Sequence, residues 1–188
     1  EGELNKGTVE QKEFINLKNK FGLKYAIETG TCLGYTTDFL CDNYEKVHTV
    51  EINEKYLNFA LNNRLNKRDN VLVYIGSSAN TLIKMIKDLP EQENIFIFLD
   101  AHWGQHCPLK EELKQIKESK IKPVIAIHDF VVPNHPELGF DSINGQPFNF
   151  EWLKDDFDSI YGEGEYDYYY NSESVGAKRG IIYITPKN

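Results

Sequence analysis

Several features that would place this chain of 188 residues in a common class are missing or scarce. Cysteine occurs only three times, at Cys32, Cys41 and Cys107, and no two of these are separated by just two residues. This pattern predicts neither a disulfide framework nor a zinc knuckle, and it indicates a reducing compartment, the cytoplasm. No apolar run approaches the ~18 residues needed to span a membrane, so we expect no membrane partner. The chain begins with Glu and not Met, so whether a leader precedes it stays open.

An excess of basic residues is also lacking. Lys and Arg total 21 against 29 Asp and Glu, for a formal net charge of −8. General nucleic-acid binding normally requires a basic face, so this balance argues against it. The hydrophobic content of 40% and charged content of 27% are ordinary for a globular protein. We expect one domain over residues 1–188, in which the N-terminal helical segment 1–21 is a candidate lid.

The glycine fingerprint of dinucleotide-binding proteins, G-x-G-x-x-G, is absent as well. In its place the stretch 24–37 carries the pattern Glu-x-Gly-x-x-x-Gly, formed by Glu28, Gly30 and Gly34. A short apolar segment precedes this pattern and a polar helix start follows it, which predicts a strand, a tight loop and a helix. Gly30 would let the backbone approach a ligand, and Gly34 would permit the turn and a close helix–strand contact.

The rest of the chain alternates between strand and helix patterns. Helical patterns are expected at about 8–20, 35–42, 53–65, 78–87, 108–119 and 150–157, and strands at 24–28, 46–51, 70–75, 94–100, 123–129, 166–170 and 180–185. Such alternation predicts an α/β fold with a parallel sheet that helices cover on both faces. The long segment 131–147 is predicted to be a structureless loop, and loops of that length are often functional.

Acidic residues stand at four of the first five predicted strand ends. Glu28, Glu51, Asp100 and Asp129 hold these places, and Gly76 holds the fifth. Ligands of open α/β sheets bind beyond the carboxyl ends of the strands. A buried acid is costly unless something pairs with it, so the set indicates a site, although any one of these acids could be a solvated loop carboxylate.

Glu51 is the most informative of these acids. It follows Glu28 by 23 residues and ends the second predicted strand. An acid at about this separation is placed to accept hydrogen bonds from ribose hydroxyls. The same geometry serves NAD and S-adenosylmethionine, so this residue alone does not distinguish the two cofactors.

The glycine pattern, Glu51, the strand order along the chain and the final strand pair together resemble the class I S-adenosylmethionine-dependent methyltransferases. This resemblance implies a Rossmann-like, doubly wound, mostly parallel seven-stranded sheet with an antiparallel last strand. It also implies that Glu28 and Gly30 lie beside the methionine part of the cofactor. Ile52 would pack on the adenine, and Ser77 and Ser78 would border the adenine edge unless they merely cap a helix. The implied cofactor-binding set is Glu28, Gly30, Thr31, Gly34, Glu51, Ile52, Ser77, Ser78 and Asp100.

Two further segments, 99–103 and 127–130, are similar to the metal-dependent O-methyltransferases of the catechol and macrocin types. The similarity implies that Asp100, His128 and Asp129 hold a divalent metal. A histidine ligand would favour Mn²⁺, Fe²⁺ or Zn²⁺ over Mg²⁺. The chain departs from the catechol type, which has one residue fewer between its Asp and His, and a general-base lysine at the place of Gly104.

Histidine is the remaining group that titrates near neutral pH and could serve as the base. The implied catalytic set is Asp100, His102 and His128, with His106 as a further candidate base. The alternative interpretation is that these are loop or core histidines hydrogen-bonded to the backbone.

The sequence therefore predicts an S-adenosylmethionine-dependent methyltransferase that acts on a hydroxyl of a small molecule or sugar. The loop 131–147 would cover this acceptor, and His135, Phe140 and Asp141 would contact it. Two alternatives stay open: a dinucleotide-dependent oxidoreductase, and a non-catalytic protein of the same fold that binds a nucleoside or a partner protein. Whether the protein forms a homodimer is also open.

Overall fold

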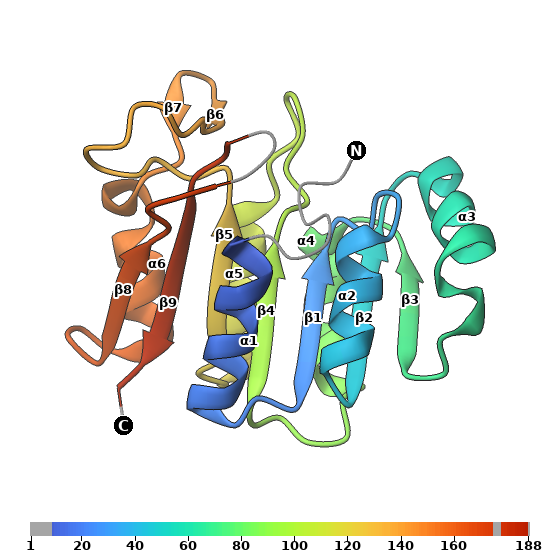
Figure 1. Ribbon diagram of the computed structural model, residues 1–188. Helices are drawn as coiled ribbons and strands as arrows, with labels where there is room; N and C mark the ends of the chain where they lie inside the picture. Colours follow the sequence, from blue (N-terminus) through green and yellow to red (C-terminus); the bar gives the residue numbers. More distant parts are fainter. Residues whose placement is uncertain (1–8, 175–177, 188) are drawn as a thin grey trace.

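The computed structural model describes residues 9–174 and 178–187. In this part of the chain, helices and strands alternate as the sequence predicts (Figure 1). The helices are α1 (Val9–Phe21), α2 (Tyr35–Asn43), α3 (Glu54–Asn63), the 3₁₀ turn η1 (Leu65–Lys67), α4 (Ser78–Lys87), α5 (Leu109–Ser119) and α6 (Phe150–Tyr161). The strands of the main sheet are β1 (Tyr25–Thr29), β2 (Lys46–Glu51), β3 (Val71–Ile75), β4 (Ile95–Leu99), β5 (Val124–His128), β8 (Tyr166–Tyr170) and β9 (Ile181–Pro186).

The sheet has seven strands in the order β3-β2-β1-β4-β5-β9-β8. Strands β1 to β5 pair in parallel, whereas β9 is antiparallel to both of its neighbours, β5 and β8. This arrangement confirms the predicted fold class, including the reversed last strand. The order switches at β1, which lies between β2 and β4, and such a switch point is where open α/β sheets bind ligands.

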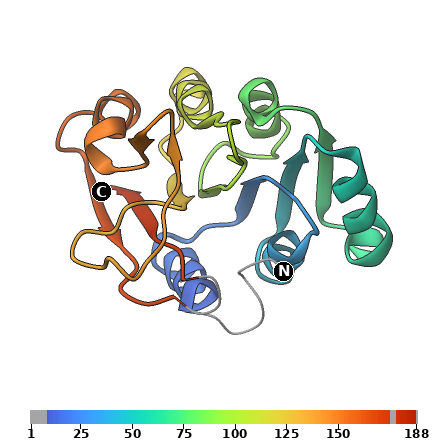
Figure 2. The ribbon, with the colours of Figure 1, turned by 90° about the horizontal axis from the view of Figure 1, so that it is seen from above.

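Helices cover both faces of the sheet. Viewed from above, α1 and α2 lie on one face and α4, α5 and α6 on the other (Figure 2). Each face has its own apolar core: Phe14 of α1 packs against Phe96 and Phe98 on the first face, and Leu82 and Ile116 belong to the cluster on the second. Phe14 is fully buried, so α1 is a packed element of the fold. A lid function of segment 1–21 stays a prediction, and residues 1–8 lie outside the described part.

The central strands are buried along their whole length. All residues of β1, β4 and β5 are buried, and β4 reads Ile-Phe-Ile-Phe-Leu. Continuous apolar runs suit strands that helices cover on both sides. Burial of apolar surface holds these strands in place at about 25 cal/mol per Å², so their carboxyl ends form a rigid edge for a site.

The ends of several elements differ from the predicted ends by one residue. Strand β1 continues past Glu28 to Thr29, which pairs with Val50 and Leu99. Glu28 therefore lies within the strand and does not close it, because the ladder of a parallel sheet extends one residue further than the apolar pattern. The first predicted helix begins at about residue 8, which lies outside the described residues.

The loop 131–147 is not structureless, and that prediction was wrong. It contains a small hairpin of β6 (Ser142–Ile143) and β7 (Gln146–Pro147). Asn144 and Gly145 form its turn with φ of 51° and 81°, the positive values that a two-residue hairpin turn requires. The Asn-Gly pair in the sequence was the available signal for this turn. In Figure 1 the hairpin lies above the sheet, at the edge where β4 and β5 end.

All three cysteines are free thiols, of which Cys32 is exposed and Cys41 is buried. Among the helices of the described residues, none has the length and apolar character needed to cross a membrane.

Candidate active site

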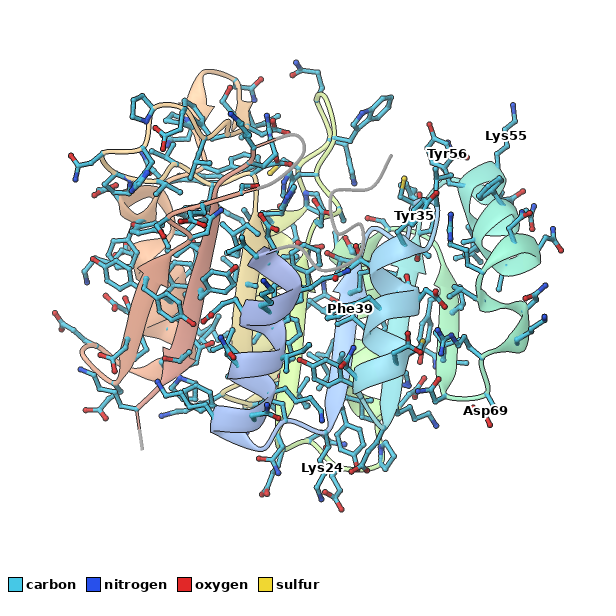
Figure 3. All side chains as sticks on the ribbon, viewed as in Figure 1. Lys24, Tyr35, Phe39, Lys55, Tyr56 and Asp69 are labelled. Atoms are coloured by element: carbon cyan, nitrogen blue, oxygen red, sulfur yellow. The ribbon has the colours of Figure 1, made fainter. Side chains whose placement is uncertain are left out.

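A cavity of about 880 Å³ opens at the carboxyl ends of β1, β2, β4 and β5. Its volume is at the upper end of the range of small-molecule sites. Tyr35 and Tyr56 line it and lie together at the upper edge of α2 and α3, whereas Lys24 and Asp69 lie at the opposite edge (Figure 3). The cavity therefore lies where the strand order predicts a ligand.

The glycine loop forms one wall of this cavity. Gly30 has φ of 89°, and a Cβ there would come within 2.4 Å of the Asp100 carbonyl oxygen. Only glycine fits this position without a shift of the backbone. Gly30 and Thr31 line the cavity, as the sequence predicts. The loop therefore reaches the end of β4 through backbone contact alone.

Gly34 begins α2 and does not belong to the cavity wall. Its φ is 78°, and a Cβ there would lie 3.0 Å from the Cβ of Ala60 in α3. The predicted turn into the helix is present. The close contact, however, is between two helices and not between a helix and a strand, because α3 packs beside the start of α2.

The end of the cavity formed by the glycine loop and the residues after β2 is where the sequence predicts the cofactor, and we call it the cofactor end. Glu51 connects the two loops that flank it. Its Oε2 accepts a hydrogen bond of 2.8 Å from the backbone N–H of Cys32, and its Oε1 accepts one of 2.8 Å from that of Asn53. The side chain is buried but lines the cavity. A carboxylate has lone pairs beyond these two bonds, so Glu51 can still accept from hydroxyl groups of a ligand.

The adenine side of the predicted site is an apolar wall. Ile52 is 58% exposed and Tyr56 is 46% exposed, and both line the cavity. Ser77 and Ser78 line it too, and the Ser77 side chain makes no capping hydrogen bond at the start of α4. The Ser77 hydroxyl is therefore not used as a helix cap. Tyr56 was not predicted from the sequence, although it follows Ile52 by four residues.

Glu28 is not in the cavity wall. It is buried between the sheet and α2, where its Oε2 accepts hydrogen bonds from the hydroxyls of Thr37 and Thr49. Burial raises the pKa of Glu28 to about 8, and the two hydroxyl donors oppose this only in part. The structure thus places Glu28 behind the glycine loop, where it supports the loop. A direct contact with the cofactor stays a prediction that this geometry does not favour.

The end of the cavity beside the residues after β4 and β5 is where the sequence predicts the acceptor, and we call it the acceptor end. It holds a cluster of acids and histidines. Single ligand atoms of Asp100, His102 and Asp129 lie within 4.8 Å of one another. His128 also faces this cluster, since its Nδ1 lies 3.2 Å from Asp100 Oδ1 and 3.3 Å from Asp129 Oδ2. All four side chains line the cavity. The predicted metal set was Asp100, His128 and Asp129, and the geometry brings His102 into this group.

Asp129 is held as an anion at the centre of this cluster. Burial alone would raise the pKa of its carboxyl, but hydrogen bonds and charge interactions with His102 and His128 hold the pKa well below its usual range. Its Oδ2 lies 3.1 Å from Nε2 of His102. The backbone of Asp129 has φ of 60°, a left-handed conformation that is uncommon outside glycine and recurs at functional sites.

A short turn and one arginine complete the acceptor end. Trp103 and His106 pair through backbone hydrogen bonds of 2.8 and 2.9 Å, and the Trp103 side chain is 83% exposed at the mouth of the cavity. Arg179, just before β9, donates hydrogen bonds to Asp129 and Asp141. Arg179 was not predicted from the sequence, because nothing in the local pattern around it shows that it contacts residues 38 and 50 positions earlier.

Of the three predicted acceptor contacts in the loop 131–147, only Asp141 lines the cavity. His135 pairs instead with Glu137 at 2.8 Å, and Phe140 is exposed outside the wall. The loop reaches the site through a single side chain, so two of the three predicted contacts do not have the expected position.

No protein-family model matches the chain, and no match was found among the curated proteins. Several solved structures, however, are similar to this chain over most of its length. The O-methyltransferase TomG from Streptomyces achromogenes, in complex with S-adenosylmethionine, superposes with a TM-score of 0.66 at 16% identity, over 95% of this chain and 80% of TomG. An O-methyltransferase from Bacillus cereus in complex with S-adenosylhomocysteine gives a TM-score of 0.65 at 23% identity, over 95% of this chain and 80% of the Bacillus protein.

A third similar structure is CalS10, described as an amino pentose methyltransferase from Micromonospora echinaspora with bound S-adenosylmethionine. It gives a TM-score of 0.61 at 12% identity, over 95% of this chain and 90% of CalS10. At these identities the likeness concerns the fold. The fold of this chain is therefore that of the S-adenosylmethionine-dependent methyltransferases, as the resemblance of its sequence implied.

Proposed function

We propose that this protein is an S-adenosylmethionine-dependent methyltransferase that acts on a hydroxyl group of a small molecule. One observation carries the proposal. A single cavity joins the glycine loop and Glu51 at one end to the cluster of Asp100, His102 and Asp129 at the other. A bound cofactor and an acceptor would meet between these two ends.

The cofactor end offers one feature for each part of S-adenosylmethionine. The ribose hydroxyls would donate to Glu51, and the adenine would pack against Ile52 and Tyr56. The methionine part would lie along Gly30 and Thr31, next to Asp100, whose N–H donates to the Thr29 carbonyl at 3.2 Å. This placement would direct the methyl group toward the acceptor end, and methyl transfer depends mainly on such in-line orientation.

The donor set at the acceptor end fits a divalent metal. Asp100 and Asp129 supply carboxylate oxygens and His102 supplies an imidazole nitrogen, all within 4.8 Å. Carboxylate with imidazole suits Mn²⁺, Fe²⁺ or Zn²⁺ better than Mg²⁺. When bound, such an ion lowers the pKa of a coordinated hydroxyl.

The chain's own groups can also move the proton. The acceptor oxygen attacks the methyl carbon, the carbon–sulfur bond breaks, and its electron pair stays on sulfur to give neutral S-adenosylhomocysteine. The hydroxyl proton passes to an imidazole of the cluster, His102 or His128. Asp129 is an anion beside both rings and stabilises the imidazolium that forms.

A sugar or another small molecule with several hydroxyls fits the acceptor end best. The rim presents the exposed indole of Trp103, and the charged groups of Asp141 and Arg179 line the same cavity. Indole faces pack on sugar rings, while carboxylates and guanidinium groups pair with hydroxyls. The amino pentose acceptor of the similar CalS10 supports this choice.

The three free cysteines support a reducing compartment, the cytoplasm.

Calorimetric titration with S-adenosylhomocysteine tests the proposal, with NAD as the competing ligand. We expect saturable binding of S-adenosylhomocysteine and no heat from NAD. The reverse result would favour the dinucleotide-dependent oxidoreductase. Transfer of a labelled methyl group to a panel of phenols and sugars then separates an enzyme from a non-catalytic binder.

The metal is tested separately. With cofactor bound, Mn²⁺ should give a saturable heat that disappears in Asp100→Ala. If the cofactor binds and Mn²⁺ gives no heat in the unmodified protein, the histidine route alone stands.

A further inference from the structure

Arg179 lies where three segments of the chain cross. Its Nε donates to Oδ1 of Asp129 at the end of β5, and its Nη2 donates to Oδ1 of Asp141 in the loop 131–147. The side chain is partly buried and lines the cavity. A planar guanidinium with donors in a fixed fork can hold two carboxylates in one relative position.

Backbone hydrogen bonds join the same three segments. Gly139 N–H donates to the Lys178 carbonyl at 2.7 Å, and Gly180 N–H donates to the Gly139 carbonyl at 2.9 Å. Asp141 N–H donates to the Asp129 carbonyl at 2.9 Å. The loop is thus attached on both sides of Arg179, and the guanidinium adds the side-chain connection to this backbone network.

Gly139 leaves the space that the guanidinium occupies. A Cβ at this position would lie 2.8 Å from Nη1 of Arg179 and 3.3 Å from its Cδ. Any larger residue would push the arginine side chain away from the loop. The two residues are therefore fitted to each other, as expected where an arginine has a fixed place.

Arg179 binds only one of the two oxygens of the Asp129 carboxylate. Oδ1 is taken by the guanidinium, while Oδ2 faces His102 at 3.1 Å and His128 at 3.3 Å. Without Arg179, Oδ1 would lose its guanidinium donor, and the carboxylate would be held through Oδ2 and the two imidazoles. With Arg179 in place, Oδ2 stays directed toward the imidazoles.

We propose that Arg179 is a positioning residue that fixes the Asp129 carboxylate and attaches the loop 131–147 to the acceptor end of the cavity. The inference deepens the proposed function and rests on it, since the loop would present Asp141 to the acceptor. Asp129 would act on the substrate, on the metal or on the imidazole that accepts the proton. Arg179 acts through Asp129 and Asp141.

Three variants separate the two connections. Arg179→Met removes both, Asp141→Asn weakens only the connection to the loop, and the double variant tests whether they act as one unit. Arg68→Met is the matched control, because Arg68 also pairs with two aspartates, Asp38 and Asp42, and precedes β3, an edge strand of the sheet.

The measurements are hydrogen exchange of peptides from the loop 131–147 and, at one fixed pH, the ring NMR signals of His102 and His128. We expect Arg179→Met to speed loop exchange about tenfold and to move the ring signals. Asp141→Asn should speed loop exchange while leaving the ring signals nearly unchanged. The double variant should exchange no faster than Arg179→Met, because both remove the same connection. Arg68→Met should change neither signal.

Unchanged loop exchange in both Arg179→Met and Asp141→Asn would overturn the inference. So would equal acceleration in peptides of β1 and β4, which would make Arg179 a general stabiliser of the fold. Titration of each variant with S-adenosylhomocysteine keeps the two hypotheses apart. If the unmodified protein failed to bind it, the proposed function would fail, whereas the exchange data would still decide the role of Arg179 in the loop.

Discussion

The two ends of the cavity are built in different ways. The cofactor end comes from the segments that follow three neighbouring strands, β1, β2 and β3, and it combines backbone groups of the glycine loop with the side chains of Glu51, Ile52 and Tyr56. The acceptor end takes side chains from four separate places: the ends of β4 and β5, the loop 131–147, and the residue before β9. A common cofactor needs the same backbone cradle, whereas acceptors differ and are recognised by side chains on loops.

The buried carboxyl groups of the two ends differ in charge. Glu28, behind the glycine loop, has only hydroxyl groups as hydrogen-bond donors, and burial raises its pKa to about 8. Asp129 is beside two histidines and an arginine, and its pKa is held low. A neutral acid can support a loop, while an anion can act on a proton or a cation. The chemistry therefore belongs to the acceptor end.

The largest expected effect concerns Glu28 and pH. The folded state holds its proton up to pH about 8, whereas the unfolded state loses it near 4.5, so the folded state binds more protons in between. The free energy of unfolding should then fall as pH rises through this window, by about 3.5 kcal/mol between pH 5 and pH 8. Denaturant unfolding of the unmodified protein and Glu28→Gln at each pH measures this. The amide cannot ionise, so the variant should lack this slope. Parallel curves would show that Glu28 is ionised like Asp129.

Gly30→Ala should have the next largest effect. The new Cβ would meet the Asp100 carbonyl oxygen at 2.4 Å, in a backbone conformation that alanine rarely adopts. We expect affinity for S-adenosylhomocysteine to fall about 100-fold, or about 3 kcal/mol, by calorimetry. Gly22→Ala is the control, since Gly22 has φ of 61° but nothing within 4 Å of the new Cβ. Equal binding by both variants would mean that the loop does not contact the cofactor.

Glu51→Ala should weaken S-adenosylhomocysteine binding by about 2 kcal/mol, or about 30-fold. The variant removes the ribose acceptor and also releases the N–H groups of Cys32 and Asn53. Glu51→Gln keeps one carbonyl acceptor and should lose less. If Glu51→Gln bound as tightly as the unmodified protein, charge on this residue would be unimportant for the cofactor.

The difference between the two ends also explains what the sequence could predict. Gly30 and Glu51 were found because a local pattern fixes local backbone geometry, and the strand order then places that geometry at the switch point. Ile52 came from the resemblance to the methyltransferases. Asp100 and Asp129 were found because the carboxyl ends of neighbouring parallel strands meet, whereas His102 and His128 came from the resemblance to the metal-dependent O-methyltransferases. The α/β fold with a parallel sheet followed from the alternation of elements, and the antiparallel last strand followed from the resemblance. The main error of the fold prediction was the hairpin at Asn144 and Gly145.

Arg179 could not be found in this way. Its partners lie 38 and 50 residues earlier, and the pairing depends on β9 entering the sheet between β5 and β8. The position of Tyr56 in the cavity wall and the position of Glu28 behind the glycine loop depend on which face of an element meets the cavity. Such facts follow from packing in three dimensions, since a one-residue shift in a strand moves a side chain to the other face.

The smallest expected effect is at the apolar wall. Ile52 is exposed in the cavity and would lose contact with water when an adenine covers it. Ile52→Ala should therefore weaken S-adenosylhomocysteine binding by about 1 kcal/mol, or about fivefold. Phe59→Ala is the matched control, because Phe59 is an apolar residue of α3 with 43% exposure that does not line the cavity. If both substitutions weakened binding equally, the effect would come from a disturbed α3. If only Ile52→Ala did, the adenine lies on this wall, and the acceptor end remains free for the second substrate.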